Sequence, residues 1–200
     1  MLRPGRQLRL VFLRISGVML MVGGLTACDF ALRSEQPLFR AGGQAPQPGL
    51  WAFMRGSCTP PSSGAIETWP ECAAPVWLNG DVATFLFEGP VRADFVISDS
   101  APGIVRLAPR RAASMDDAAK GFDDDGYAYA VVEAEGPSPF GKARLWAIDC
   151  RHAEQPAADV TDEDACRAKT EQAVRLAGAL ARKDEPTWTA VLVSPAAAQP

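Results

Sequence analysis

The chain contains 200 residues, of which 48% are hydrophobic and 22% are charged, a composition typical of one folded domain. Its net charge is −4, but residues 1–27 hold four arginines and no acidic residue, so the rest of the chain has 16 basic and 24 acidic residues. An acidic main part disfavours binding to nucleic acid, which depends on clustered Lys and Arg side chains.

The first segment is typical of an export signal. Residues 1–14 are basic, and the next 13 residues, Ile15 to Ala27, carry no charge. This run fits the apolar region of about 7–15 residues in a signal peptide, whereas a membrane-spanning helix needs about 20 residues. Because Arg14 interrupts any extension upstream, we favour a signal peptide over residues 1–27 rather than a permanent span.

The apolar run ends in Leu25-Thr26-Ala27-Cys28. This tetrapeptide resembles the lipobox of bacterial prolipoproteins, in which a branched apolar residue and two small residues precede the lipid-bearing cysteine. The resemblance covers residues 1–28 only. It implies that the Cys28 thiol receives a diacylglyceryl group, that a signal peptidase cuts before Cys28, and that an acyl chain such as palmitate is added to the freed amine. The alternative is an ordinary signal peptide followed by an unrelated cysteine.

The resemblance also implies a location. A lipoprotein of this kind is anchored in the bacterial cell envelope, with its domain facing the periplasm and the membrane as its partner through the lipid. In enteric bacteria an Asp directly after the lipid-bearing cysteine tends to retain the protein in the inner membrane. Asp29 therefore favours the inner membrane over the outer one.

Four further cysteines predict two disulfides. Four sulfur atoms allow three pairings, and the choice closest in sequence joins Cys58 to Cys72 and Cys150 to Cys166. Each bridge would close a loop of about 15 residues and contribute roughly 3 kcal/mol in the chain-entropy model. The oxidising periplasm preserves such bridges. Without a C-x-x-C motif or a grouping with histidine, a metal site or a redox pair is the weaker interpretation.

The turn and strand patterns divide the rest of the chain. Residues 28–48 are expected to form a lipidated N-terminus and flexible tether, 49–194 one globular domain, and 195–200 a disordered tail. The domain is expected to begin with a strand at 49–54, followed by a loop at 58–72 that the first disulfide holds. A hairpin is expected at 75–88, around Asn79-Gly80, and a pair of strands at 91–98 and 104–108, on either side of 99–103. A second hairpin is expected at 127–150. Residues 109–120 are expected to form a short helix.

A long helix is predicted over residues 161–183, with Thr161 as its cap and acidic residues in its first turn. On a helical wheel Cys166 lies on the same apolar stripe as Ala173 and Ala177, so the cysteine would point toward Cys150. A last strand is expected over 187–193. The predicted fold class is therefore α+β, an antiparallel β-sheet with one long C-terminal α-helix packed on it and two disulfides.

Four features of the sequence are candidate functional sites. The segment 136–142 has the spacing of a phosphate loop, but Ala143 replaces the Mg²⁺-binding Ser or Thr and two prolines remove amide donors, so it is interpreted as a turn. The carboxylates of Asp123, Asp124 and Asp125 do not match an EF-hand loop and are better explained as a solvated acidic turn. His152 is the one histidine and is interpreted as a loop residue rather than a general base.

Tryptophan provides the last candidate. Most of the five tryptophans lie in apolar runs, which favours core packing, and Trp69 in the loop of the first disulfide is the one expected to be exposed for binding. The possible binding residues are therefore Trp69, Asp123, Asp124, Asp125 and His152, and no catalytic residue, metal ligand or cofactor is predicted.

The functional hypothesis is a lipid-anchored envelope protein that acts as a non-catalytic binding module for an envelope protein or a cell-wall component. One alternative is an envelope hydrolase that uses Asp and His groups. The other is a structural or stress lipoprotein without a specific ligand.

Overall fold

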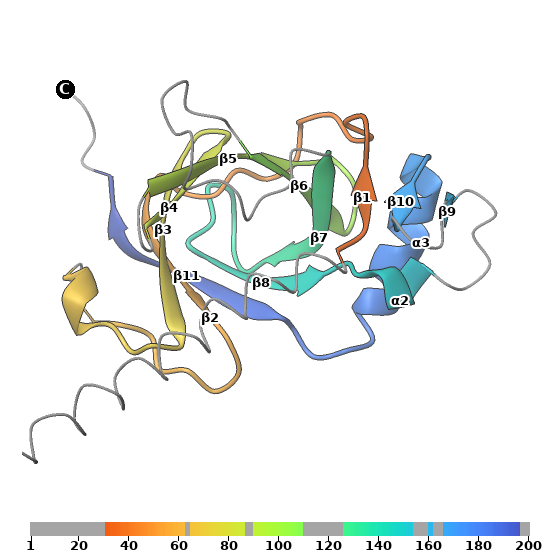
Figure 1. Ribbon diagram of the computed structural model, residues 1–200. Helices are drawn as coiled ribbons and strands as arrows, with labels where there is room; N and C mark the ends of the chain where they lie inside the picture. The colour runs from red at the N-terminus through yellow and green to blue at the C-terminus, as the bar shows by residue number, and fades with distance from the viewer. Residues whose placement is uncertain are drawn as a thin grey trace, which may run out of the picture. The chain divides into compact units, whose positions relative to one another are not determined.

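The computed structural model describes residues 31–62, 65–86, 90–109, 126–153, 160–161 and 166–196 (Figure 1). Cys28 and Asp29, the acidic turn at 123–125, and nearly all of the short helix expected at 109–120 lie outside the described residues. Among the helices that are described, none has the length and apolar character needed to cross a bilayer.

Eight antiparallel strands close into a barrel. The first seven follow one another as a meander, and the last strand in the chain inserts between β8 and β2. Pairing of β6 with β7 completes the circle. The strands are β2 (Gly49–Met54), β3 (Ala73–Asn79), β4 (Val82–Leu86), β5 (Pro90–Ile97), β6 (Gly103–Pro109), β7 (Tyr127–Ala134), β8 (Lys142–Ala147) and β11 (Trp188–Pro195). The prediction of a sheet covered by one long helix is therefore wrong, because every one of these strands has a partner on both sides.

The expected strands and hairpins are confirmed within this barrel. Gly80 has φ +61°, the left-handed conformation that a tight turn after Asn79 requires, and β3 and β4 pair across it. The strands on either side of 99–103 are β5 and β6, and the second hairpin is β7 with β8. Both the first and the last strand also form where the apolar runs predicted them.

The barrel interior is filled by side chains that alternate along the strands, as expected for eight strands. Trp51 is the largest of the completely buried side chains and lies in this inner cluster. Its other buried members are Val76, Leu78, Ala83, Phe95, Ile97, Val105, Ala130, Val132, Phe140, Ala143, Leu145 and Ala190.

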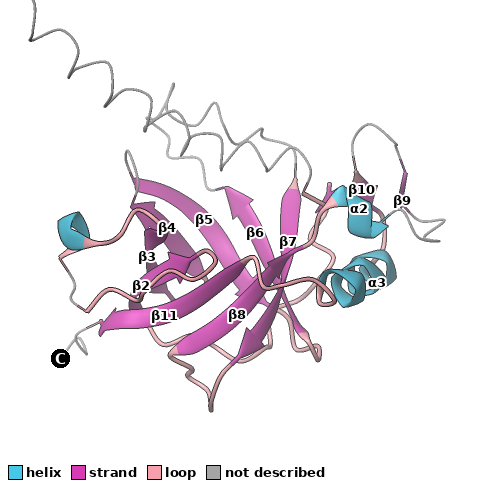
Figure 2. Cartoon of the chain, turned by 90° about the horizontal axis from the view of Figure 1, so that it is seen from below, coloured by secondary structure: helices cyan, strands magenta, loops and turns pink. Residues whose placement is uncertain are grey.

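A second cluster covers the outer face of β6, β7 and β8. Here α3 (Glu171–Ala181) lies beside β7 (Figure 2). Its buried face packs on Ile104, Val131 and Ile148, and Val174 is completely buried. The short elements β1 (Arg33–Ser34), α2 (Cys150–Ala153), β9 (Val160–Thr161) and β10 (Arg167–Ala168) belong to the same side. Because β7 is covered on both faces, Val131 and Val132 are both buried, which explains why its sequence alternates only weakly.

The C-terminal helix is shorter than predicted. It has 11 residues and begins after Thr170, whose side chain accepts a hydrogen bond from the Ala173 amide. Cys166 has φ +49°, a conformation that interrupts a helix, and Arg167 then pairs with Arg33 of β1. Of the predicted apolar stripe, Ala173 and Ala177 are buried but Leu180 is only half-buried, and the stripe does not extend back to Cys166 in helical geometry.

Residues 31–48 lie along the barrel, although the sequence led us to expect a tether there. Leu32, Ser34 and Phe39 are buried, and the Leu32 amide donates to the Ile148 carbonyl at 2.8 Å. Farther on, the chain crosses one end of the barrel, where the Gln47 amide donates to the Phe140 carbonyl at 2.8 Å. We call residues 41–48 the strap.

Both predicted disulfides are present. Cys58–Cys72 closes the loop that contains a short 3-10 helix, Ile66–Thr68, and this loop covers part of the outer face of β2 and β3. Cys150–Cys166 joins α2 to the residue before β10 and lies at the outer cluster under α3. The first bridge therefore constrains the long segment between β2 and β3, and the second constrains the long segment between β8 and β11.

Candidate functional site

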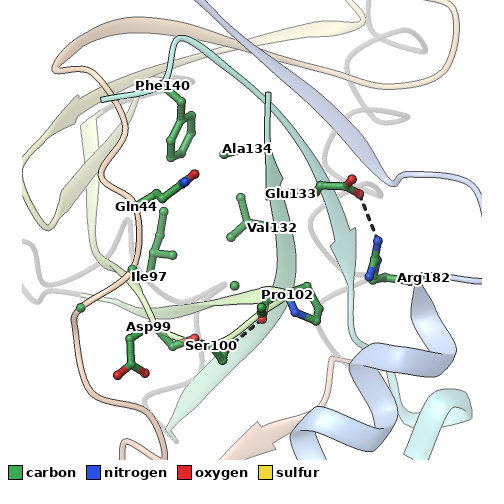
Figure 3. Close-up of a pocket in the computed structure, with 15 residues that line it drawn as sticks. Gln44, Ile97, Asp99, Ser100, Pro102, Val132, Glu133, Ala134, Phe140 and Arg182 are labelled. Carbon is green, nitrogen blue, oxygen red and sulfur yellow. Dashed lines mark hydrogen bonds and ion pairs between the residues drawn. The ribbon is translucent and has the colours of Figure 1, made fainter. Parts of the chain in front are cut away.

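A cavity of about 600 Å³ lies at the end of the barrel where β5 and β7 end and β6 and β8 begin (Figure 3). Its walls come from the strap, the β5–β6 turn and the end of β7. We call this end the mouth. The lining residues are Gly42, Gly43, Gln44, Ile97, Ser98, Asp99, Ser100, Ala101, Pro102, Gly103, Val132, Glu133, Ala134, Phe140 and Arg182.

The strap can approach the barrel this closely because it contains glycine. The amides of Gly42 and Gly43 both donate to the Ile97 carbonyl, at 3.3 and 3.1 Å. A Cβ atom on Gly43 would lie 2.1 Å from the Ser98 carbonyl oxygen, so any larger residue would push the strap away. The two glycines therefore set the position of this wall of the cavity.

The floor of the cavity is apolar. Ile97, Val132 and Phe140 belong to the inner cluster, and Figure 3 shows them around the space between the strap and β7. Phe140 is 3% exposed and contacts Trp51 edge to face, with ring centroids 5.9 Å apart. A ligand in the cavity would therefore contact the end of the packed interior without entering it.

The hydroxyl groups of the rim are already engaged. Ser98 Oγ accepts from the Ile104 amide at 2.9 Å and lies 2.6 Å from Ser100 Oγ, and Ser100 Oγ in turn donates to the Pro102 carbonyl. Because the Ser100 proton goes to that carbonyl, Ser98 donates to Ser100. Among the residues that line the cavity none is a histidine or a cysteine, and the hydrogen-bond partners of the two serine hydroxyls are each other and backbone groups rather than a carboxylate.

Of the two carboxylates at the rim, Glu133 forms ion pairs and Asp99 forms none with the residues that the structure describes. Glu133 points to the outer side of β7, where it contacts Arg182 and Arg144, each at 3.3 Å (Figure 3). Asp99 is exposed and has no ion-pair partner among the described residues. The charge that the rim offers to a ligand is therefore the Asp99 carboxylate, which suits a cation or a hydrogen-bond donor.

His152 lies elsewhere, at the outer cluster beside α3, and is not a lining residue. Its Nδ1 accepts from the Asp149 amide at 3.2 Å, and its Nε2 lies 3.1 Å from Asp184 Oδ2. Asp149 Oδ1 lies 3.0 Å from Nδ1 and is buried without a hydrogen-bond partner among the described residues. With both nitrogens engaged and the side chain 9% exposed, this arrangement links α2 to the chain after α3.

The other predicted site residues do not meet at the cavity. Trp69 is half-buried and packs on the cluster formed by Ala52, Met54 and Ala73, and residues 123–125 lie outside the described part of the chain. Where the structure is described, it contains no group of three or more His, Cys, Asp and Glu side chains placed to hold a metal ion. Gly43, Asp99 and Phe140 line the cavity but were not predicted from the sequence, because they lie in three separate connecting segments and share no motif.

Comparison with protein-family models finds no match, and comparisons with curated proteins and with solved structures find none either. The barrel and the cavity at its mouth are therefore interpreted from their own geometry.

Proposed function

We propose that this protein is a lipid-anchored component of the bacterial cell envelope and that its barrel is a non-catalytic binding module. The observation that carries the binding role is the cavity at the mouth, with its apolar floor and the exposed Asp99 at its rim. Its volume, about 600 Å³, lies within the range of roughly 300–1,000 Å³ typical of sites for small ligands. The anchor rests on the Leu25–Cys28 tetrapeptide.

The chemistry of the cavity defines the class of partner. Ile97 and Phe140 would provide apolar contacts at the floor, while the Asp99 carboxylate would select for a cationic or hydrogen-bond-donating group. A side chain of an envelope protein or a peptide group of a cell-wall component that combines an apolar portion with an amine fits this description.

A hydrolase is less well supported by the geometry. His152 has both ring nitrogens engaged by its neighbours, and the serines at the mouth are hydrogen-bonded to each other and to backbone groups. A general base must reach a proton of the substrate or nucleophile, and His152 is not a lining residue of the cavity.

The binding role is tested by photo-crosslinking in intact cells. A photoreactive residue at Gln44, which lines the cavity, should form an adduct, and Ala101→Trp, which fills the cavity, should abolish it. The same probe at Pro137, an exposed turn residue outside the lining, serves as the control. Adducts that are identical at both positions and insensitive to Ala101→Trp, or no adduct at Gln44, would contradict a binding role for the cavity.

The anchor is tested separately. Labelled palmitate should appear on the purified protein and disappear in Cys28→Ser, and globomycin should block processing of the precursor. A precursor that is processed normally in globomycin would contradict the lipobox interpretation.

A further inference from the structure

The described chain is attached to the barrel from its first residue. Ala31 forms a β-bridge with Asp149, and the Leu32 amide donates to the Ile148 carbonyl. The Leu32 side chain is completely buried in the outer cluster. The chain is therefore held directly against the wall of the barrel from Ala31 onward.

The attachment point lies at the end opposite the mouth. Ala31 contacts the residues just after the end of β8, and Arg33 pairs with Ala128 at the start of β7. The cavity lies where β7 ends and β8 begins. The length of β8, from Ala147 to Lys142, separates the two ends by about 17 Å.

Ala31 follows Cys28 in the sequence after only Asp29 and Phe30. Even fully extended, such a segment spans about 10 Å at most. Anchoring at Cys28 would then keep the Ala31 end of the barrel at the membrane surface. A flexible tether that extended to residue 48 would not restrict the barrel in this way.

We propose that the end of the barrel formed by Ala31, Asp149 and α2 lies against the lipid headgroups, so that the mouth faces away from the bilayer. This inference rests on the lipid anchor proposed above. It specifies which partners the cavity can take, namely groups presented from the periplasmic side rather than lipids of the same membrane.

The charge of Arg151 at this end does not itself hold the barrel on the membrane. Arg151 is 70% exposed, but its guanidinium is paired with Asp149 at 2.8 Å and with Asp184 at 3.2 Å. A compensated side chain gains little from anionic lipids. The orientation should therefore persist when the salt concentration is raised or the vesicles contain only neutral lipids.

Collisional quenching in vesicles tests the orientation. The full chain is expressed in a bacterium that processes it, with an azide-bearing residue at position 151 or, in a second protein, at position 137, so that a fluorophore can be attached without using cysteine. Pro137 is an exposed residue of the β7–β8 turn, at the mouth end. The purified proteins are placed in neutral vesicles whose headgroups carry a nitroxide, which quenches only at short range.

The fluorophore at position 151 should lose most of its emission, and the one at 137 should keep it. A flexible Gly/Ser insert of about 20 residues between Phe30 and Ala31, which reaches roughly 25 Å, should restore the emission at position 151. Equal quenching at both positions on protein that floats with the vesicles would overturn the orientation alone. Protein that neither carries palmitate nor floats with the vesicles would overturn the anchor, and with it the orientation.

Discussion

The hydroxyl oxygens of Tyr129 and Ser34 lie 2.5 Å apart, and this contact joins the first described segment to the outer wall of the barrel. The Gln36 carbonyl accepts from the Ser34 hydroxyl at 2.5 Å and from the Tyr129 hydroxyl at 3.4 Å, and the Leu38 amide donates to the Tyr129 hydroxyl at 3.3 Å. Burial raises the pKa of the Tyr129 hydroxyl, although its hydrogen bonds with Ser34 and Leu38 lower it in part.

Tyr129→Phe should lower the free energy of unfolding by about 1–2 kcal/mol at neutral pH, because it leaves Ser34 and the Leu38 amide with fewer partners. Urea unfolding measures this change. Tyr127→Phe is the matched control, since Tyr127 is only partly buried and its ring faces the Arg106 guanidinium. An equal loss in both variants would show that the Tyr129 hydroxyl has no special role.

The same tyrosine predicts a dependence on alkaline pH. A pKa raised in the folded state means that the native protein holds this proton more tightly than the unfolded chain. Its contribution is therefore complete below the unfolded pKa of about 10 and is lost as the pH rises through the higher folded pKa. Stability should fall above about pH 10 by up to roughly 1.4 kcal/mol per pH unit more in the wild type than in Tyr129→Phe. Parallel pH profiles would contradict this.

Gly43→Ala should destabilise the protein by about 1–3 kcal/mol and move the strap, because the new methyl would overlap the Ser98 carbonyl oxygen. The adduct formed from a probe at Gln44 should weaken in parallel. In Gly141→Ala, the nearest atom to the new methyl is 3.8 Å away, so this variant should retain both stability and the adduct. Thermal unfolding of the two variants side by side measures the difference.

Gly178→Val should also destabilise the protein by about 1–3 kcal/mol. Gly178 lies on the buried face of α3, where an added Cβ would be 2.9 Å from Val131 Cγ2 and 3.3 Å from Ile148 Cδ1. Leu176→Ala changes the opposite, solvent-facing side of the same helix, where Leu176 is 43% exposed, and should have little effect. If both substitutions are neutral, α3 does not depend on close packing against β7.

Replacing Cys150 and Cys166 by Ala should cost about 3 kcal/mol from the lost loop constraint, and further stability from packing, because Cys166 is buried under α3. The bridge between Cys58 and Cys72 closes a loop of similar length, but Cys72 is exposed and Cys58 only partly buried, so its removal should cost the constraint and less packing. Chemical unfolding of the two double variants under oxidising conditions compares them, and a greater loss for the Cys58–Cys72 pair would contradict the prediction.

Much of the local structure was predictable from the sequence. Asn79-Gly80 defines a hairpin through backbone conformation alone, the apolar runs mark the strands, and the spacing of the cysteines selects both disulfides. These features depend on residues close together in the chain, so short-range physical chemistry is sufficient to read them.

The closed barrel, the shorter helix and the cavity were decided only by tertiary structure. Alternation of apolar residues shows that strands exist, but not that β11 inserts between β8 and β2. Cys166 has a left-handed conformation, is bridged to Cys150 and precedes Arg167, which pairs with β1, and a helical wheel includes none of these features. Gly43, Asp99 and Phe140 form one cavity only because closure brings three distant turns to the same end of the barrel, and local sequence carries no information about contacts of that range.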